Sequence, residues 1–386
     1  MYPCHDLRVL DMARVVAGPI AGRILSDLGA DVVKLEPPEG DVTRVWGQVR
    51  HGLSGFYTQQ NAGKRNVCVD LRAPGGVALV KQLAASADIV IENFRAGVLD
   101  RLGLGYADLA AMNERLIMLS VSGFGHGGPE SHRPAYAPMM QAETGLVRRQ
   151  AEFDDVWPTD PMLSIADTYA GLHGTIGIFA ALRARDQTGH GQHIDMAMFD
   201  AMVFTDDYAH HAVDNEPVVR LGGDVYETVI GPVLFAGQLR TVWNALKDVI
   251  ADPAAGDVPI PDKARLRKQA VQDWARSFDN FDDLGAALDK AGLAFGVVKD
   301  QVDVVRSPTA QHRGSVATID DNSGTGATRG VVQTPYRFSD AQSGVRGAAP
   351  HRGQHNREVL TEWTDLDQAA VDSLVAEGVL QTDEFA

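Results

Sequence analysis

An aspartate near the middle of the chain, Asp167, has the setting of a group that could do covalent chemistry. It follows the apolar stretch 163–166 and opens the Gly- and Ala-rich stretch 167–185, which predicts a buried and closely packed helix. The amide dipoles of a first helical turn can hold a carboxylate ionised without a paired cation. Such a carboxylate can act as a nucleophile or simply cap the helix, and the residue pattern alone leaves both interpretations open.

The sequence gives less support for a metal site, a serine hydrolase site or a P-loop. Asp206 and His210, and likewise Asp207 and His211, stand four residues apart, but pairs at this spacing are commonly solvated helix neighbours, which we favour over a metal site. Ser122 lacks the leading glycine of a hydrolase nucleophile elbow, and the chain has no P-loop motif. We therefore expect no metal and no serine hydrolase chemistry.

Several basic residues lie near expected strand ends or in loops of the N-terminal half, where open α/β sheets bind ligands: Arg14, Lys34, Arg44, Lys64, Arg65, Arg95 and Arg101. The chain as a whole has 35 Lys and Arg against 51 Asp and Glu, a net charge of −16 that repels nucleic acids and anionic membrane surfaces. We expect neither of those partners. A small polyanion could bind only where basic residues gather, and a solvated surface explains the same residues equally well.

The elements that would position these residues alternate over the first 125 residues. Short β-branched runs predict strands over 7–10, 32–35, 67–71, 89–93 and 116–121, and amphipathic stretches predict helices over 20–28, 75–86 and 98–112. This alternation is typical of βαβ units, so we expect an α/β fold with a parallel, Rossmann-like sheet. The turn 11–19 lacks the Gly-x-Gly-x-x-Gly fingerprint, which argues against a dinucleotide.

The rest of the chain predicts a second, smaller domain. A strand over 193–198 follows the Gly- and Ala-rich helix, and the composition shifts near Glu216. After that come a Pro- and Gly-rich linker over 251–263, polar helices over 264–277 and 282–291, a strand over 294–298 and a hairpin loop over 320–330. These elements are typical of an α+β domain.

The cysteine content and the N-terminal residues indicate in which cellular compartment the protein lies. Cys4 and Cys68 are the only cysteines, so neither a thiolate metal site nor a disulfide framework can form. The N-terminal residues lack the pattern of a signal peptide, and no apolar run approaches the ~18 residues of a membrane span. We expect a cytoplasmic protein.

The chain resembles the class III CoA-transferases, the group that contains formyl-CoA:oxalate CoA-transferase and carnitine CoA-transferase, with α-methylacyl-CoA racemase as a relative. The matching segments occur in order along most of the chain: LRVLDMARVVAGPIAGRILSDLGADVVKLEPPEGD, NAGKRNVCVDL, IENFRAGVLDRLGLGY, SVSGFGHGGP, SIADTYAG, TGHGQHIDMAMFDA and, near the C-terminus, GAAPHRGQHNREVLTE.

The resemblance carries expectations about fold and reaction. It implies a discontinuous Rossmann-like large domain over 1–205 and 328–386, a small α+β domain over 206–327 and a homodimer of interlocked subunits. Asp167 matches the family's catalytic aspartate, which would pass CoA from an acyl-CoA thioester to a free carboxylic acid through a covalent aspartyl intermediate. CoA and acyl-CoA are then substrates, and no permanently bound cofactor is expected.

The resemblance also implies contacts. It assigns to CoA the residues Arg14, Val15, Val16, Ala17, Lys64, Arg65, Asn93, Phe94, Arg95 and Arg101. It assigns to the acyl pocket Trp46, Tyr136 and the glycine pair Gly222 and Gly223, which could also be a plain turn.

Two departures from the family pattern bear on the substrate. The racemases carry a histidine base where this chain has Tyr136, and a tyrosine with a pKa near 10 is a poor base at neutral pH. Oxalate-type enzymes carry a glutamine where this chain has Val16. An acyl-CoA racemase or isomerase and a catalytically silent CoA-binding homologue remain the alternative functions.

Overall fold

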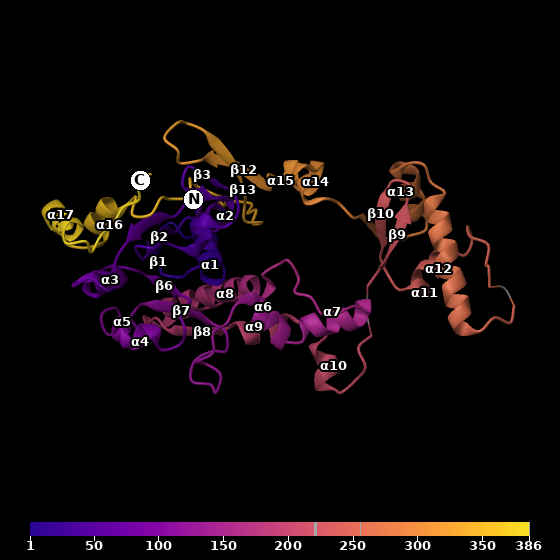
Figure 1. The fold of residues 1–386 in the computed structure, drawn as a ribbon, viewed down its shortest axis with the longest axis horizontal. Coiled ribbons are helices and arrows are strands. Elements are labelled where there is room, and N and C mark those ends of the chain that lie inside the picture. Colours follow the sequence, from indigo (N-terminus) through magenta and orange to yellow (C-terminus); the bar gives the residue numbers. More distant parts are fainter. Residues whose placement is uncertain (220–221, 255, 386) are drawn as a thin grey trace. The chain divides into compact units, whose positions relative to one another are not determined.

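The chain forms two compact units. The structure is a computed structural model, and it describes residues 1–219, 222–254 and 256–385. Unit 1 comprises Met1–Ala209 and His312–Ala386, and unit 2 comprises His210–Gln311 (Figure 1). The domain boundaries expected after residues 205 and 327 stay a prediction.

Unit 1 is built on a parallel sheet, as expected. Its strands are β1 (Arg8–Asp11), β2 (Asp31–Glu36), β5 (Arg65–Cys68), β6 (Ile89–Glu92), β7 (Ile117–Ser122) and β8 (His193–Ala197), in the order β5-β2-β1-β6-β7-β8. Each neighbouring pair is parallel. The chain places β2 on one side of β1 and β6 on the other, so the strand order changes direction between β1 and β6. Loops at the carboxyl ends of strands flanking such a point form the usual ligand crevice of this kind of sheet.

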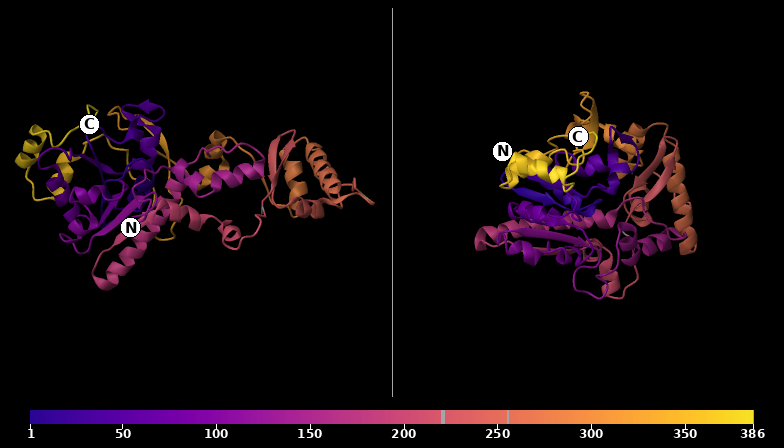
Figure 2. Two further views of the ribbon diagram at one scale, coloured as in Figure 1. Left: turned by 60° about the horizontal axis from the view of Figure 1, so that its bottom comes forward. Right: turned by 60° about the vertical axis from the view of Figure 1, so that its left-hand side comes forward.

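Both faces of the sheet are covered, because side chains alternate between two hydrophobic clusters. Ile89 and Ile91 of β6 pack with α1 (Ala17–Asp27) and α8 (Ile165–Thr188), whereas Val90 packs on the opposite face. That face carries α3 (Gly76–Ala85), α5 (Tyr106–Ala110), α16 (Asn356–Trp363) and α17 (Gln368–Ala376). The C-terminal helices therefore lie beside the N-terminal sheet (Figure 2).

Shorter elements complete unit 1. They are η1 (Val42–Val45), β3 (Val49–Arg50), β4 (Leu53–Ser54), α2 (Gly55–Asn61), α4 (Val98–Arg101), α6 (Ala137–Glu143), α7 (Leu146–Asp154), α9 (Met198–Thr205) and the hairpin of β12 (Val316–Asp320) and β13 (Thr328–Val332). The single helix expected over 98–112 is wrong. Gly103 adopts a left-handed φ of 68° between α4 and α5, which ends the first helix.

Unit 2 has its own antiparallel sheet and core. The sheet has the order β11-β10-β9, with β9 (Asp224–Thr228), β10 (Gly231–Phe235) and β11 (Phe295–Val297). It packs with α11 (Leu239–Leu246), α12 (Ile260–Arg276) and α13 (Phe281–Lys290) around Phe235 and Leu284. The remaining helices are α10 (Ala209–Val213), α14 (Gln301–Arg306) and α15 (Pro308–Arg313).

Helix α8 is buried on one face rather than all round. Ala170, Gly174 and Ile178 lie in the core. The opposite face exposes Leu172, Ile176 and Phe179, and the neighbouring α9 exposes Phe199, Val203 and Phe204. We call these six exposed residues the outer apolar face. Within unit 1, the expectation of a buried helix is confirmed for one face of α8 and wrong for the other, because no described part of unit 1 covers the outer apolar face.

Candidate functional site

The loop that follows β1 is held between the loops that follow its two neighbouring strands. The Arg14 amide donates to the Asn93 side-chain oxygen at 2.7 Å, and the Asn93 side-chain nitrogen donates back to the Arg14 carbonyl at 2.7 Å. The Val15 amide donates to Asp41 Oδ2 at 3.1 Å. Asn93 follows β6 and Asp41 follows β2, so these bonds assemble the crevice at the point where the strand order changes direction.

Val15 has a strained backbone that its neighbours hold in place. Its φ of 69° is an outlier for a β-branched residue. The buried Lys34 ammonium donates to the Ala13 carbonyl and lies 3.2 Å from Asp41 Oδ2. Burial alone would favour the protonated acid, but the Lys34 charge and hydrogen bonds from Thr43 and Val15 lower the pKa of Asp41 to about 2. An ionised buried pair thus fixes the loop 13–15.

Asp167 reaches the same edge of the sheet through α8. At the far end of the helix, Arg185 Nη1 contacts Asp88 Oδ1 at 3.0 Å, and Asp88 immediately precedes β6. The last turns of α8 therefore lie at the amino edge, and at 1.5 Å per residue Asp167 lies about 27 Å away toward the carboxyl edge. One turn after Asp167, Gly171 packs so closely on α1 that an added Cβ would lie 2.6 Å from the Ala17 carbonyl oxygen. This contact brings Asp167 to the beginning of α1.

Gln141, rather than Asp167, caps α8. The Gln141 Oε1 atom accepts the Ile165 amide at 2.7 Å and the Ala166 amide at 3.5 Å, and the Gln141 side chain is fully buried. Within the described residues the Asp167 carboxylate has no hydrogen-bond or ion-pair partner. Burial raises the pKa of Asp167 to about 6. The group is therefore ionised at neutral pH and is more basic than an ordinary aspartate.

The structure gives Lys64 and Arg65 partners within the scaffold. The buried Lys64 ammonium donates to Asp11 Oδ2 at 2.7 Å, to the Pro19 carbonyl at 2.9 Å and to Asn61 Oδ1 at 3.0 Å, which uses its three protons. Burial is the main cause that lowers the pKa of Lys64 to about 8. Lys64 thereby ties the end of β1 to the start of α1.

Arg65 lies toward the other edge of the sheet. It begins β5 and contacts Asp31, the first residue of β2, with an Nε–Oδ1 distance of 3.0 Å. It also contacts Glu358 and Glu362 of α16 at 2.9 and 2.7 Å. Since Asp167 reaches the carboxyl edge, this geometry favours a structural role for Arg65 over the expected contact with CoA.

The other expected CoA residues do gather at the carboxyl edge. Arg14, Arg95 and Arg101 are exposed, and Val16 and Ala17 begin α1. The Phe94 amide donates to the Glu92 carboxylate at 2.7 Å. The grouping is therefore an exposed set of guanidinium groups beside a backbone that buried acids and amides hold in place.

Arg95 lines a cavity of about 260 Å³, most of whose other lining residues no sequence motif had marked. Glu92, Tyr106, His126 and His193 also line it. Burial raises the pKa of Glu92 to about 7. Glu92 lies at the end of β6, directly before Asn93. Its position at a strand end could have identified it as a candidate site residue from the sequence. Gln141 had no such signal, because it caps a helix that begins 24 residues further along the chain.

The residues expected in the acyl pocket come from both units. Trp46 follows η1 and is 40% exposed, and Tyr136 is exposed at the start of α6, which packs on α8. Gly222 and Gly223 belong to unit 2, just before β9. An added Cβ at Gly223 would lie 2.1 Å from the Phe235 carbonyl oxygen, so glycine is required there by close packing alone.

In residues 1–219, 222–254 and 256–385, no group of three or more His, Cys, Asp or Glu side chains could hold a metal ion. In the same residues, no helix combines the length and the apolar character that crossing a membrane requires.

Comparisons with known proteins identify the family of the chain. The sequence profile of CoA-transferase family III matches residues 4–356. The chain is 32% identical to a succinate–glutarate CoA-transferase of Agrobacterium fabrum, over 95% of this chain and 97% of that protein. It is 31% identical to a succinyl-CoA–D-citramalate CoA-transferase of Chloroflexus aurantiacus, over 98% of each chain. The crystal structure of a CAIB/BAIF family protein from Brucella suis superposes with a TM-score of 0.78 at 32% identity, covering 94% of this chain and 99% of that one. The chain therefore belongs to CoA-transferase family III and is a CoA-transferase.

Proposed function

We propose that this enzyme transfers CoA from an acyl-CoA thioester to a free carboxylic acid with Asp167 as the covalent nucleophile. The observation that carries the proposal is the Asp167 carboxylate at the start of α8, which has no hydrogen-bond or ion-pair partner among the residues that the structure describes, while Gln141 already caps the helix. A carboxylate that has no structural partner and is ionised at neutral pH is available for attack on a thioester.

The reaction needs two acyl exchanges on the same carboxylate. An Asp167 oxygen attacks the thioester carbon, the CoA thiolate leaves, and a mixed anhydride remains. The thiolate then attacks the aspartyl carbonyl carbon, which releases the donor acid and leaves an aspartyl-CoA thioester. The acceptor carboxylate attacks the carbonyl carbon of this thioester, the CoA thiolate leaves, and a second mixed anhydride forms. The thiolate then attacks the acyl carbon of the acceptor, which releases the acceptor's CoA thioester and restores the Asp167 carboxylate. No proton is gained or lost overall, so the site requires no general base.

The exposed arginines at the carboxyl edge support binding of the CoA phosphates. Arg14, Arg95 and Arg101 concentrate positive charge in a chain whose net charge is −16. Guanidinium groups form strong, charge-assisted hydrogen bonds with phosphate oxygens. We assign Lys64 and Arg65 to the scaffold, because their donors contact Asp11, Asp31 and other groups of the fold.

We further propose that the acid is a dicarboxylic acid. The two relatives described above are named for succinate, glutarate and citramalate, which all carry two carboxyl groups. An acceptor of this kind presents one carboxylate to the reaction and a second one to the protein.

The outer apolar face supports assembly with a second copy of the chain. Exposed apolar patches of this kind commonly mark protein interfaces, and Leu172, Ile176 and Phe179 recur at helical spacing along α8. We propose that the interlocked homodimer expected from the family covers this face. Light scattering on Ile176→Asp should show loss of the dimer, whereas Val375→Asp, at a lone exposed valine of α17, should leave it intact. A wild-type monomer would refute the proposal.

Intact-protein mass spectrometry tests the nucleophile. The enzyme is incubated with a panel of acyl-CoAs and then with hydroxylamine, which converts an aspartyl thioester to a hydroxamate. We expect a modification at residue 167 in the wild type and none in Asp167→Asn, which keeps the shape of the side chain. Transfer by Asp167→Asn at the wild-type rate would overturn the assignment. CoA binding without exchange of any acid would favour the silent-homologue alternative, and racemisation without an added acid would favour the racemase.

A further inference from the structure

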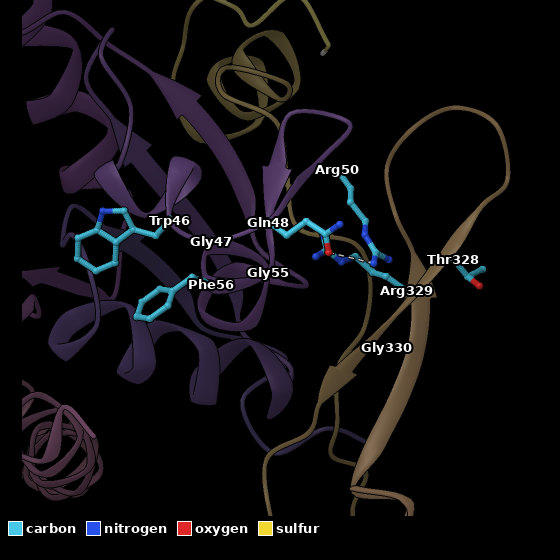
Figure 3. Close-up of a pocket in the computed structure, with 9 residues that line it drawn as sticks. All are labelled: Trp46, Gly47, Gln48, Arg50, Gly55, Phe56, Thr328, Arg329 and Gly330. Atoms are coloured by element: carbon cyan, nitrogen blue, oxygen red, sulfur yellow. Dashed lines mark hydrogen bonds between the residues drawn. The ribbon is translucent and has the colours of Figure 1, made fainter. Parts of the chain in front are cut away.

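A second cavity of unit 1, of about 740 Å³, lies between the segment 46–56 and the β12–β13 hairpin. The aromatic side chains of Trp46 and Phe56 form one side, and Gln48, Arg50 and Arg329 converge on the other (Figure 3). Arg50 and Arg329 are 279 positions apart in the sequence and meet only through the fold.

The cavity is lined by positive charge, whereas the protein as a whole is negatively charged. Of the described residues that line it, two are arginines and none is acidic, although the chain carries a net charge of −16. Each arginine has a neutral partner: Arg50 Nη2 donates to Gln48 Oε1 at 3.2 Å, and Arg329 Nη1 donates to the Leu53 carbonyl at 3.2 Å. A guanidinium has five N–H groups, so several donors on each side chain remain for a ligand.

The two guanidinium groups repel each other. Burial and the charge of Arg50 together lower the pKa of Arg329, and the nearby Asp321 only partly offsets them. Asp321 itself lies 3.8 Å from His51 Nε2. Two like charges that meet at an open cavity indicate a place for an anion, which relieves the repulsion.

The aromatic side of the cavity suits a short carbon chain. Trp46 and Phe56 meet edge to face with ring centroids 5.2 Å apart and present apolar surface next to the arginines. Trp46 is also close to the crevice. The 3-10 helix η1 begins directly after Asp41, which holds Val15, and its rise of roughly 2 Å per residue brings the chain to Trp46 within about 10 Å.

We propose that Arg50 and Arg329 bind the second carboxylate of the dicarboxylic acid that exchanges CoA, with Trp46 and Phe56 against its carbon chain. This inference rests on the proposed function and names the residues that select the substrate class. Arginine suits the role because its planar donors match a carboxylate in two-point contact.

Paired acceptor acids test the inference. With one donor thioester held constant, kcat/KM is measured for glutarate and for valerate, which has the same carbon chain and a single carboxylate. Arg50→Gln and Arg329→Gln should each lower kcat/KM for glutarate by about 10- to 100-fold, the loss of a charged hydrogen-bonded contact, and change it for valerate by less than about 3-fold. Arg148→Gln, at an exposed arginine of α7 outside the cavity, is the matched control. Retained valerate activity shows that each variant folds.

A binding measurement separates this inference from the proposed function. Calorimetry follows glutarate binding to Asp167→Asn and to the same protein with Arg50→Gln added. Weaker glutarate binding in the second protein supports the cavity assignment, whether or not the enzyme transfers CoA. Equal binding, or no glutarate binding in either protein, overturns it. If the wild type transfers CoA to neither acid, the proposed function fails for these acids, and calorimetry still decides the role of the cavity.

Discussion

The close contact between α8 and α1 makes Gly171 the most informative single substitution in the scaffold. In Gly171→Ala the new Cβ would lie 2.0 Å from Ile20 Cγ2 and 2.6 Å from the Ala17 carbonyl oxygen. The Ile20 side chain can rotate, but the carbonyl belongs to the backbone. Against a normal separation of about 3.5 Å, the two helices must move apart by about 1 Å.

The stability change is expected to be small and the activity change large. Overpacking costs about 1–3 kcal/mol, and replacing glycine with alanine inside a helix returns about 1 kcal/mol, so the net loss is about 0–2 kcal/mol. Asp167 lies one turn away and moves with α8. A displacement of about 1 Å at a reacting group can cost about 10²-fold in rate.

Gly177→Ala on the same helix is the matched control. Its Cβ would lie 3.2 Å from Ile194 Cγ2, a contact that a few tenths of an ångström relieve, so this variant should be as stable as the wild type or more so. Thermal unfolding and kcat for CoA transfer are measured on both variants. Wild-type kcat in Gly171→Ala, or an equal loss in Gly177→Ala, would refute the claim that this contact positions Asp167.

Three further predictions concern charged groups. Because burial raises the pKa of Asp167 from 3.8 to about 6, kcat/KM should rise with pH through about 6, and a flat pH profile between 5 and 7 would contradict this. The buried ionised carboxylate also destabilises the fold above that pH. Asp167→Asn should therefore be more stable than the wild type above pH 6 and lose this difference in stability below pH 3.8. Lys34→Met or Asp41→Asn should each lower the free energy of unfolding by about 3–5 kcal/mol in urea titrations, because each leaves a buried partner unpaired; losses under 1 kcal/mol would contradict the buried pair. Arg95→Ala should weaken CoA binding by about 10-fold in calorimetry, whereas Arg65→Ala should leave it within about 2-fold; equal effects would show that the phosphate site is misplaced.

The sheet could be predicted from the sequence because its strands are short apolar runs separated by helices of ordinary length. The expected strands over 7–10, 89–93 and 116–121 correspond closely to β1, β6 and β7. Whether a residue precedes or follows its strand also indicates at which edge of the sheet it lies. Arg14 and Asn93 follow strands and lie at the carboxyl edge, whereas Arg65 precedes the expected strand 67–71 and lies toward the amino edge. The sequence analysis assigned all three residues to CoA because it did not use the direction of the strands, which distinguishes Arg65 from the other two.

Contacts between distant segments could not be predicted in this way. Gln141 caps α8 from another helix, and no local pattern marks a glutamine for that role. Arg50 and Arg329 meet because the β12–β13 hairpin returns to the N-terminal segment. The exposed side of α8 was also missed, because a helix that is apolar all round has the same composition whether its second face packs on its own chain or on another molecule.

The packing of the C-terminal segment on the N-terminal sheet affects the order in which the two units can fold during synthesis. The edge strand β5 receives its neighbours from the end of the chain: the Cys68 amide donates to Asn356 Oδ1 at 2.9 Å, and the Asp70 amide donates to the Val379 carbonyl at 2.9 Å. At roughly 5–20 residues per second, the ribosome needs on the order of 10–30 s to reach these residues after residue 209. Unit 2 is contiguous and can fold in that interval, while the nascent large unit presents an open apolar strand edge. A ribosome-bound chaperone that shields this edge should raise the yield of folded enzyme, and a nascent chain stopped before residue 356 should aggregate through it.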